Sequence, residues 1–275
     1  MIINNNIAAL NTHRQMGQVS GNASNSMEKL SSGMRINRGA DDAAGLSISE
    51  KMRGQIRGLE QASKNSQDAV SLIQTADGAL NETHAVLQRM RELTVQAAND
   101  TNSDAERAAI DGELGELTST ITDIAANTQF NGQKLLDGSA GTAGVLTIQS
   151  GANSGETLSL DLTNANLTGT ITALEGIDVT ADGGATAALT VLDTAIQTVS
   201  DARAYTGAVQ NRLDYTINNL NASAENTQAA ESRIRDVDMA KEMMNLTKNN
   251  ILTQASQAML AQANQAPQAV LQLLR

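Results

Sequence analysis

The sequence predicts a mainly α protein: long antiparallel coiled-coil helices from both chain ends, with a small middle segment that contains a β-hairpin. Three observations lead to this fold class. Apolar residues recur at alternating steps of three and four over long stretches, as in helices that pack on other helices. Pro267 is the one proline, so almost every stretch can be helical. The chain has no tryptophan, one phenylalanine and two tyrosines, which suits thin helical seams better than a wide globular core.

The first helix is expected to begin near Asn5 or Asn6, either of which can cap it, and Gly33 can end it or lie in its last turn. Its apolar residues follow helical spacing: Ile7, Leu10, Met16, Val19, Met27, Leu30 and Met34. A turn-rich connection over 35–46 follows, where Asp41 or Asp42 can cap the next helix. We interpret this aspartate pair as a cap and not as a metal site, because no third ligand lies nearby in the sequence.

From residue 43 to about residue 99 the pattern is helical, with an expected break around 63–66. Ile73, Leu80 and Leu87 repeat every seven residues, which predicts a coiled-coil seam, and His84 falls on this seam as a structural residue. After a polar turn, Asp104 can cap a further helix that folds back antiparallel. The regular apolar positions of that helix are Ile110, Leu114, Leu117, Ile121 and Ile124.

The middle of the chain reads as turns and short strands. Asn131-Gly132 favours a tight turn, and residues 145–149 and 157–162 alternate polar and apolar side chains as the two arms of a hairpin. Residues 167–174, rich in threonine and isoleucine, are expected to add a short strand. The loop over 176–184 carries Asp178 and Asp182 but lacks the ligand spacing of a calcium-binding EF-hand.

A third long helix is expected from about residue 185 to residue 221, with Arg203 and Gln210 as polar positions that fix its register against neighbouring acids. Residues 225–275 then form one long apolar seam that this stretch cannot bury by itself, so a partner surface is required. The seam comprises Ile234, Val237, Met244, Ile251, Ala255, Met259, Ala263, Ala266, Val270 and Leu273.

Composition and charge exclude several functions. Residues 101–185 hold 2 basic and 12 acidic side chains, a net charge of −10, and no basic stripe is present, so nucleic-acid binding is not expected. The chain has no cysteine, no His-Glu-x-x-His motif and no histidine in the middle segment. We therefore expect that it is not an enzyme and that it binds no metal ion and no cofactor. No window reaches the roughly 18 apolar residues of a membrane span, and the first ten residues lack a signal-peptide pattern.

Four stretches, two near each end of the chain, resemble the terminal signatures of bacterial flagellin. At the start these are residues 27–38, Met-Glu-Lys-Leu-Ser-Ser-Gly-Met-Arg-Ile-Asn-Arg, and residues 41–49. At the end they are residues 230–242 and 254–264. The resemblance covers about residues 1–138 and 186–275, and it departs from many family members at Ile2 and at Gly39-Ala40.

The resemblance implies a structural subunit that polymerises into the flagellar filament for swimming motility. The implied domains are a terminal inner-tube helical domain (1–42 and 233–275), a helical rod domain (43–138 and 186–232) and a short variable surface segment with the hairpin (139–185). The implied partners are further copies of the chain, a flagellar export chaperone and cap and junction proteins. The implied location is outside the cell, in the filament. A hook-filament junction protein is the alternative within the same structural class.

The terminal seams and the resemblance together give candidate site residues. Six apolar residues are predicted to be buried between subunits: Leu10, Met27, Leu30, Ile251, Met259 and Leu273. Residues 88–96 resemble the segment by which a host flagellin-sensing Toll-like receptor binds many family members, and the matching positions are Arg89, Leu93 and, on the next helix, Glu113. Arg89 and Leu93 lie four residues apart and are expected to share one helix face. The alternative is that Arg89 is a solvated charge and Leu93 packs on a neighbouring subunit.

Overall fold

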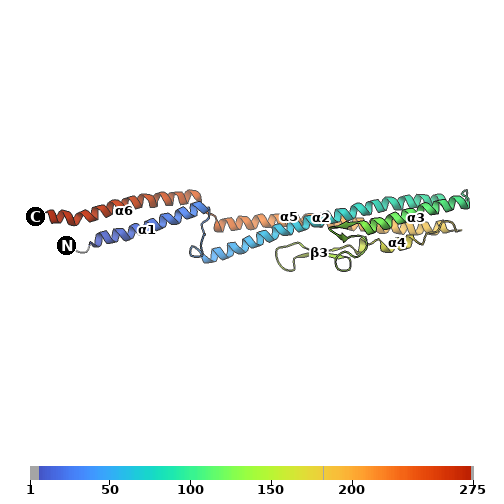
Figure 1. Ribbon diagram of the computed structural model, residues 1–275, viewed down its shortest axis with the longest axis horizontal. Helices are drawn as coiled ribbons and strands as arrows, with labels where there is room; N and C mark the ends of the chain where they lie inside the picture. The colour runs from blue at the N-terminus through green and yellow to red at the C-terminus, as the bar shows by residue number, and fades with distance from the viewer. Residues whose placement is uncertain (1–5, 182, 274–275) are drawn as a thin grey trace. The chain divides into compact units, whose positions relative to one another are not determined.

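A computed structural model of the protein describes residues 6–181 and 183–273, and for residues 266–273 it describes the backbone alone. The long helices are α1 (Ile7–Ser32), α2 (Ala43–Ala97), α3 (Asp104–Asn127), α5 (Gly184–Arg235) and α6 (Met239–Leu273). The short elements are β1 (Gln129–Phe130), β2 (Gln133–Lys134), β3 (Val145–Gln149), β4 (Thr157–Asp161), a 3-10 turn (Thr163–Ala165) and α4 (Thr168–Leu174). The predicted fold class is confirmed (Figure 1). The chain divides into two compact units, Met1–Gly54 with Asn226–Arg275, and Gln55–Glu225.

In the first unit, α1 lies antiparallel on α6 (Figure 1). The Asn6 side-chain amide near the start of α1 donates to the Ala263 carbonyl, 2.7 Å away, near the far end of α6. The residues turned toward the partner helix repeat at steps of three and four on both helices. On α1 they are Ala9, Thr12, Met16, Val19, Ala23, Ser26 and Leu30, and on α6 they are Glu242, Leu246, Asn249, Thr253, Ser256, Leu260 and Ala263. We call this set the intrachain seam, and most of its members are small or polar.

The ends of α1 are those that the sequence predicts. The Asn6 side-chain oxygen accepts from the Ala9 N–H at 3.1 Å, and Gly33, at φ +72°, donates its N–H to the Lys29 carbonyl. Beyond Gly33 the chain pairs briefly with the segment between α5 and α6. The Arg35 N–H donates to the Arg235 carbonyl at 2.7 Å, and the Val237 N–H donates to the Gly33 carbonyl at 3.0 Å.

The aspartate pair acts as the predicted cap. The Asp42 carboxylate accepts from the Gly45 N–H at 2.9 Å and so begins α2. The Asp41 carboxylate accepts from the backbone N–H groups of Arg38 and Asn37, and these bonds hold the pKa of Asp41 below its usual value.

In the second unit, α2 and α5 lie side by side, and α3 packs on α2 (Figure 1). The predicted seam of α2 is fully buried at Ile73, Leu80 and Leu87. The expected break around 63–66 is wrong, because α2 is continuous there. Its serines find partners without leaving the helix: Ser66 donates to the Ala62 carbonyl, and Ser63 donates to Asn221 of α5 at 3.1 Å.

Three helix boundaries differ from expectation. The N-cap residue of α3 is Ser103, whereas Asp104 is the first residue of the helix. The Ser103 N–H donates to the Glu106 carboxylate at 2.8 Å. The helix α5 continues to Arg235 instead of ending near residue 221. The terminal seam is not one helix from residue 225, because the backbone leaves the helix after Arg235 and Asp238 begins α6 by accepting from the N–H groups of Ala240 and Lys241.

The middle segment contains the predicted turn and hairpin. Asn131 and Gly132 both have positive φ, 51° and 79°, and connect the antiparallel strands β1 and β2. β3 pairs with β4 in antiparallel register from Val145 opposite Asp161 to Gln149 opposite Thr157.

The expected strand at 167–174 is wrong, because Thr168–Leu174 is the helix α4. Leu167, Thr170 and Leu174 are spaced by three and four residues and are all buried, so helical packing against the rest of the unit overrides the strand preference of threonine and isoleucine.

Candidate assembly surface

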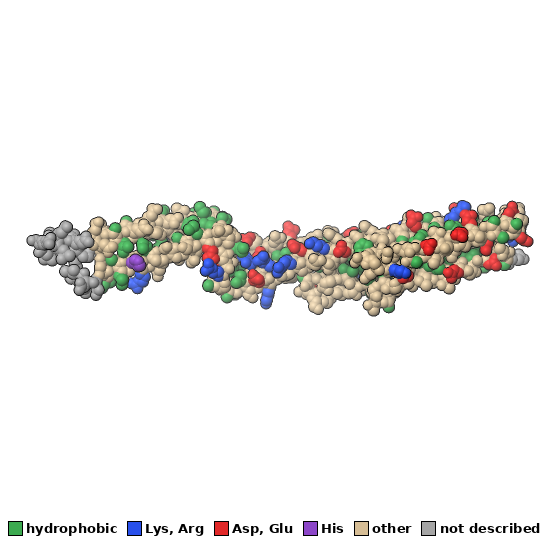
Figure 2. Space-filling view, in the orientation of Figure 1, with side chains coloured by type: hydrophobic (Ala, Val, Ile, Leu, Met, Phe, Trp, Pro, Cys, Tyr) green, Lys and Arg blue, Asp and Glu red, His purple; other side chains and the backbone are tan. Residues whose placement is uncertain are grey.

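Most of the large apolar side chains of the terminal pair point away from the intrachain seam. Its larger apolar members are Met16, Val19, Leu30, Leu246 and Leu260, and its other positions hold small or polar residues. The exposed large apolar side chains are Ile7, Leu10 and Met27 on α1 and Met239, Met243, Met244, Ile251, Leu252 and Met259 on α6. We call this set the outer apolar face. In Figure 2, hydrophobic side chains lie across the visible surface of this pair.

Four of the six predicted inter-subunit residues belong to the outer apolar face. Leu10 is 70 % exposed, Met27 60 %, Ile251 61 % and Met259 62 %. Leu30 is half-buried in the intrachain seam, and the side chain of Leu273 lies outside the described residues. The structure therefore leaves four of these side chains largely uncovered by the chain itself, whereas Leu30 is partly covered.

A shallow groove runs along α6 within this face. It has a volume of about 500 Å³ and is lined by Met243, Met244, Thr247, Lys248, Ile251 and Leu252. Sequence reasoning did not single out this groove, although Met243-Met244 and Ile251-Leu252 stand eight residues apart, close to two helical turns. An apolar helix groove of this kind can receive apolar side chains from another helix.

The expected seam of α6 and the intrachain seam are different faces of the same helix. Met244, Ile251 and Met259 were expected to lie on a single apolar line, and they do, but that line is exposed. The residues that meet α1 are two leucines among polar side chains, Leu246 and Leu260, with Asn249, Thr253 and Ser256 between them. A search for small and polar residues at steps of three and four would have found them.

One carboxylate lies in the intrachain seam. Glu242 is hydrogen-bonded to Ser26 of α1, a buried residue, and this bond is the main reason that the pKa of Glu242 is lowered. The Asn245 amide also donates to Glu242, at 3.2 Å, and Lys29 and Lys241 favour its charged form. This polar group fixes the register of the two helices where an apolar pair would slide more freely.

The three predicted receptor-contact residues separate into two environments. Arg89 is exposed and pairs with Glu113 of α3 and with Glu92, both at 3.3 Å, and these partners raise its pKa. Leu93 is 4 % exposed and belongs to the hydrophobic core of the second unit. The structure thus brings Arg89 and Glu113 together at the surface, and it places Leu93 beneath that surface instead of beside them.

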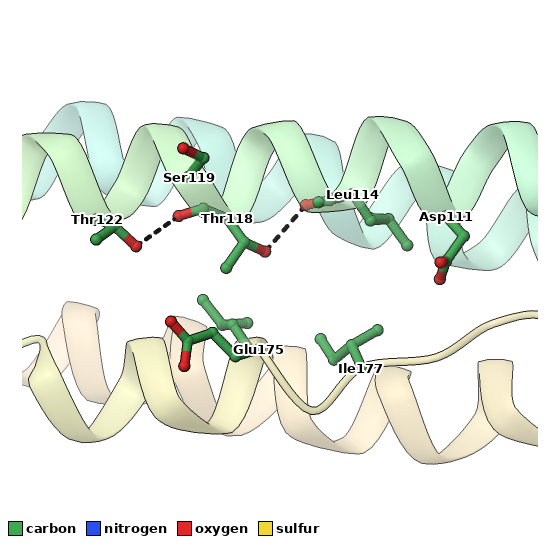
Figure 3. Close-up of a pocket in the computed structure, with 9 residues that line it drawn as sticks. Asp111, Leu114, Thr118, Ser119, Thr122, Glu175 and Ile177 are labelled. Carbon is green, nitrogen blue, oxygen red and sulfur yellow. Dashed lines mark hydrogen bonds between the residues drawn. The ribbon is translucent and has the colours of Figure 1, made fainter.

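A second groove lies between α3 and α4, with a volume of about 480 Å³ (Figure 3). Asp111, Thr118 and Thr122 of α3 face Glu175 and Ile177 across it. The hydroxyls of Thr118 and Thr122 donate to carbonyls one turn earlier, at 2.9 Å each, and Asp111 accepts from the Val179 N–H at 3.3 Å. These polar groups serve the fold of α3 and of the loop after α4.

No group of three or more His, Cys, Asp or Glu side chains in the described part of the chain is placed to hold a metal ion. No helix among residues 6–181 and 183–273 has both the length and the apolarity that a membrane crossing needs.

Both helical ends of the chain match known protein-family regions. Residues 3–141 match the bacterial flagellin N-terminal helical region, and residues 189–274 match the bacterial flagellin C-terminal helical region. A flagellin of Halalkalibacterium halodurans is 59 % identical over 275 residues, covering all of both chains. A flagellin of Bacillus subtilis is 56 % identical, and a flagellar filament 33 kDa core protein of Treponema phagedenis is 48 % identical, each also over all of both chains.

Two solved structures are similar to this chain in fold. The crystal structure of Bacillus cereus flagellin is 38 % identical, with a TM-score of 0.50, and the match covers 61 % of this chain and 94 % of that chain. A putative flagellar hook-associated protein from Vibrio parahaemolyticus has a TM-score of 0.59 at 15 % identity, covering 72 % and 98 %, which shows likeness of fold alone. The two matching terminal regions and the relatives that are 56–59 % identical over their full length show that this chain belongs to the bacterial flagellin family.

Proposed function

We propose that the chain is the repeating structural subunit of an extracellular flagellar filament and that it polymerises through its terminal helices. The observation that carries this proposal is the outer apolar face, nine large apolar side chains that the chain itself does not cover. Exposed apolar surface of this extent on a soluble protein marks an interaction site. Relatives that match over their full length are named flagellin and flagellar filament 33 kDa core protein, names that support a structural role.

The occupant of this face is a second copy of the chain. Both helices of the pair carry apolar residues outward, so each pair can offer and receive side chains in the same interface. In this proposal residues 1–42 and 233–275 form the inner tube, residues 43–138 and 186–232 form the rod, and residues 139–185 face the surroundings. An export chaperone would cover the outer apolar face before assembly, and cap and junction proteins would meet it at the filament ends.

The test is assembly of the purified chain on addition of salt, followed by electron microscopy. The intact chain is expected to form long filaments, and a chain lacking residues 260–275 is expected to stay monomeric. Filaments of normal length from the deleted chain would contradict the proposal. A hook-filament junction protein is the alternative, and it would form short rings or no polymer when it is the sole protein present.

We further propose that the free subunit is bound by a flagellin-sensing host receptor through the surface around Arg89 and Glu113. These two side chains are paired and exposed, and an arginine held by a carboxylate presents a preorganised planar cation. Arg89→Ala is expected to weaken binding of the soluble receptor ectodomain by at least about tenfold. Lys134→Ala, which removes an exposed cation elsewhere in the same unit, is the control. Equal binding by both variants would contradict the proposal.

Leu93 needs a different test because it is buried. Leu93→Ala is expected to lower the stability of the subunit, so a loss of binding by this variant does not by itself identify a contact. Leu93→Met keeps most of the core volume. If Leu93 acts through packing, this variant binds like the parent chain.

A further inference from the structure

The methionines of the outer apolar face stand apart from those elsewhere in the chain. Met239, Met243, Met244 and Met259 of α6 are 49 %, 51 %, 67 % and 62 % exposed, and the first three lie within six residues. Met90 of α2, by contrast, is fully buried in the core of the second unit. In the first unit, the Met34 sulfur already accepts a hydrogen bond from Arg235 Nε. Met27 of α1 is also 60 % exposed, so the accessible thioethers of the outer apolar face are Met27 and the four of α6, which form the larger group.

Met243 and Met244 line the shallow groove of α6, beside Ile251 and Leu252. Methionine fits irregular apolar grooves because its side chain is flexible and polarisable. The same thioether is a soft nucleophile, and its susceptibility to oxidation follows its exposure. Leucine would supply the apolar surface without this reactivity, so the choice of residue adds a chemical property to the surface.

We propose that Met239, Met243, Met244 and Met259 form a peroxide-sensitive modification site that is open in the free subunit and that, when oxidised, prevents assembly. A sulfur lone pair attacks one oxygen of hydrogen peroxide. The S–O bond forms as the O–O bond breaks, and the hydroxide that leaves takes up the proton of the oxygen now bound to sulfur. The products are methionine sulfoxide and water. Sulfur loses two electrons and the peroxide gains them. This inference rests on the proposed function of the outer apolar face.

The sulfoxide acts through its polarity. An S=O group is a strong acceptor, and burying it at an apolar interface without a donor is unfavourable. The polar side chains that line the groove, Thr247 and Lys248, are both exposed, so the groove itself supplies no buried donor. Because every subunit repeats the same contact, one modified position per subunit is enough to weaken all of them.

The first experiment measures where oxygen is added. Free subunit is treated with dilute hydrogen peroxide and digested, and each methionine is followed by mass spectrometry. The four α6 methionines are expected to oxidise on the order of tenfold faster than Met90. In filaments formed before treatment, the same four are expected to slow toward the rate of Met90. If they oxidise no faster than Met90 in the free subunit, the proposal is overturned.

The second experiment measures assembly. Treated and untreated subunits are assembled with salt, and the polymer is quantified by sedimentation. Treated subunit is expected to lose most of its assembly, and a methionine sulfoxide reductase with its reductant is expected to restore it. Failure of the untreated subunit to assemble would contradict the proposed function instead. If the untreated subunit assembles normally and the oxidised subunit assembles equally well, this inference alone is overturned.

Substitutions assign the effect to these residues. Met27→Leu, Met239→Leu, Met243→Leu, Met244→Leu and Met259→Leu are combined in one chain, so that every exposed methionine of the outer apolar face is replaced, and Met90→Leu is made as the matched control. Each variant is compared with its own untreated sample, so an effect of the substitution on assembly cancels. The combined variant is expected to keep most of its assembly after peroxide, whereas the control is expected to lose as much as the parent. Equal losses in both would show that the damage lies elsewhere.

Discussion

Arg203 of α5 and Asp77 of α2, 126 positions apart in the sequence, form an ion pair with 3.2 Å between Nε and Oδ1. The pair interrupts the apolar stripe of α5 at the place where the sequence predicts a register-fixing residue, and the expectation that Arg203 lies against a neighbouring acid is confirmed. Both side chains are more than one-third exposed, so water screens their attraction. The pair therefore specifies alignment more than it adds stability.

The contribution of the Arg203–Asp77 pair to stability can be compared with that of the buried seam by two neighbouring substitutions. Asp77→Asn is expected to lower the free energy of unfolding by less than about 1 kcal/mol, because exposed pairs contribute little. Leu80→Ala, one turn along α2 at a fully buried position, is expected to cost about 2–5 kcal/mol. Thermal unfolding of the free subunit followed by circular dichroism compares them. A larger effect at Asp77 than at Leu80 would show that the polar pair governs stability.

Replacing two glycines of α2 by alanine is expected to change stability in opposite directions. A Cβ at Gly78 meets nothing within 4 Å, so Gly78→Ala is expected to stabilise the helix by about 0.5–1 kcal/mol. A Cβ at Gly58 would lie 2.8 Å from the Ala152 Cβ and 3.1 Å from its Cα, where backbone must move. Gly58→Ala is therefore expected to lower the melting temperature. Stabilisation by both would mean that the loop of Ala152 does not hold this position in solution.

The start of α3 gives a pH prediction. The N–H and the hydroxyl of Ser103 donate to the Glu106 carboxylate and lower its pKa below the ordinary value of 4.5. A lowered folded-state pKa adds stability above the unfolded-state pKa, and this contribution is lost as pH falls through the folded value. In Glu106→Gln, which keeps an acceptor, this part of the pH dependence is expected to vanish. Melting temperatures from pH 7 to pH 3, parent against variant, provide the measurement.

Polar substitution tests the outer apolar face directly. Ile251→Ser and Met259→Ser are expected to leave the unfolding of the free subunit nearly unchanged, because both positions are exposed, and to raise the critical concentration for assembly by at least about tenfold each. Gln254→Ser, at an exposed polar position of the same helix, is the matched control. Light scattering during salt-induced assembly gives the concentrations. The same shift in the control would assign the effect to helix propensity instead of to apolar contact.

Regular spacing carried most of the fold prediction. The buried heptads of α2, the turn at Asn131-Gly132 and the hairpin of β3 and β4 are each fixed by local pattern, and all three are confirmed. The strand expected at 167–174 was wrong because Thr170 and Leu174 gain burial from the surrounding helices, which local preference does not contain. The start of α3 is set by the local bond between Ser103 and Glu106, and α5 continues to Arg235.

The candidate surface was harder to predict than the fold. Apolar periodicity identified Ile251 and Met259, but it could not tell which of two faces meets α1. The intrachain seam is marked by small and polar residues such as Asn249 and Thr253, which a search for apolar stripes passes over. For Leu93 the local spacing to Arg89 suggested a shared exposed face, whereas its burial is set by α2's neighbours.

Because most residues of the intrachain seam are small or polar, we expect the folding of the α1–α6 pair to depend on the concentration of the subunit. Asn249, Thr253 and Ser256 contribute little apolar area when α1 and α6 pack together, and the larger side chains remain for other copies. When folding and association are linked in this way, stability rises with protomer concentration. The helix content of residues 7–32 and 239–273 should therefore depend on how much protein is present, whereas that of the core around Leu80 and Leu87 should not.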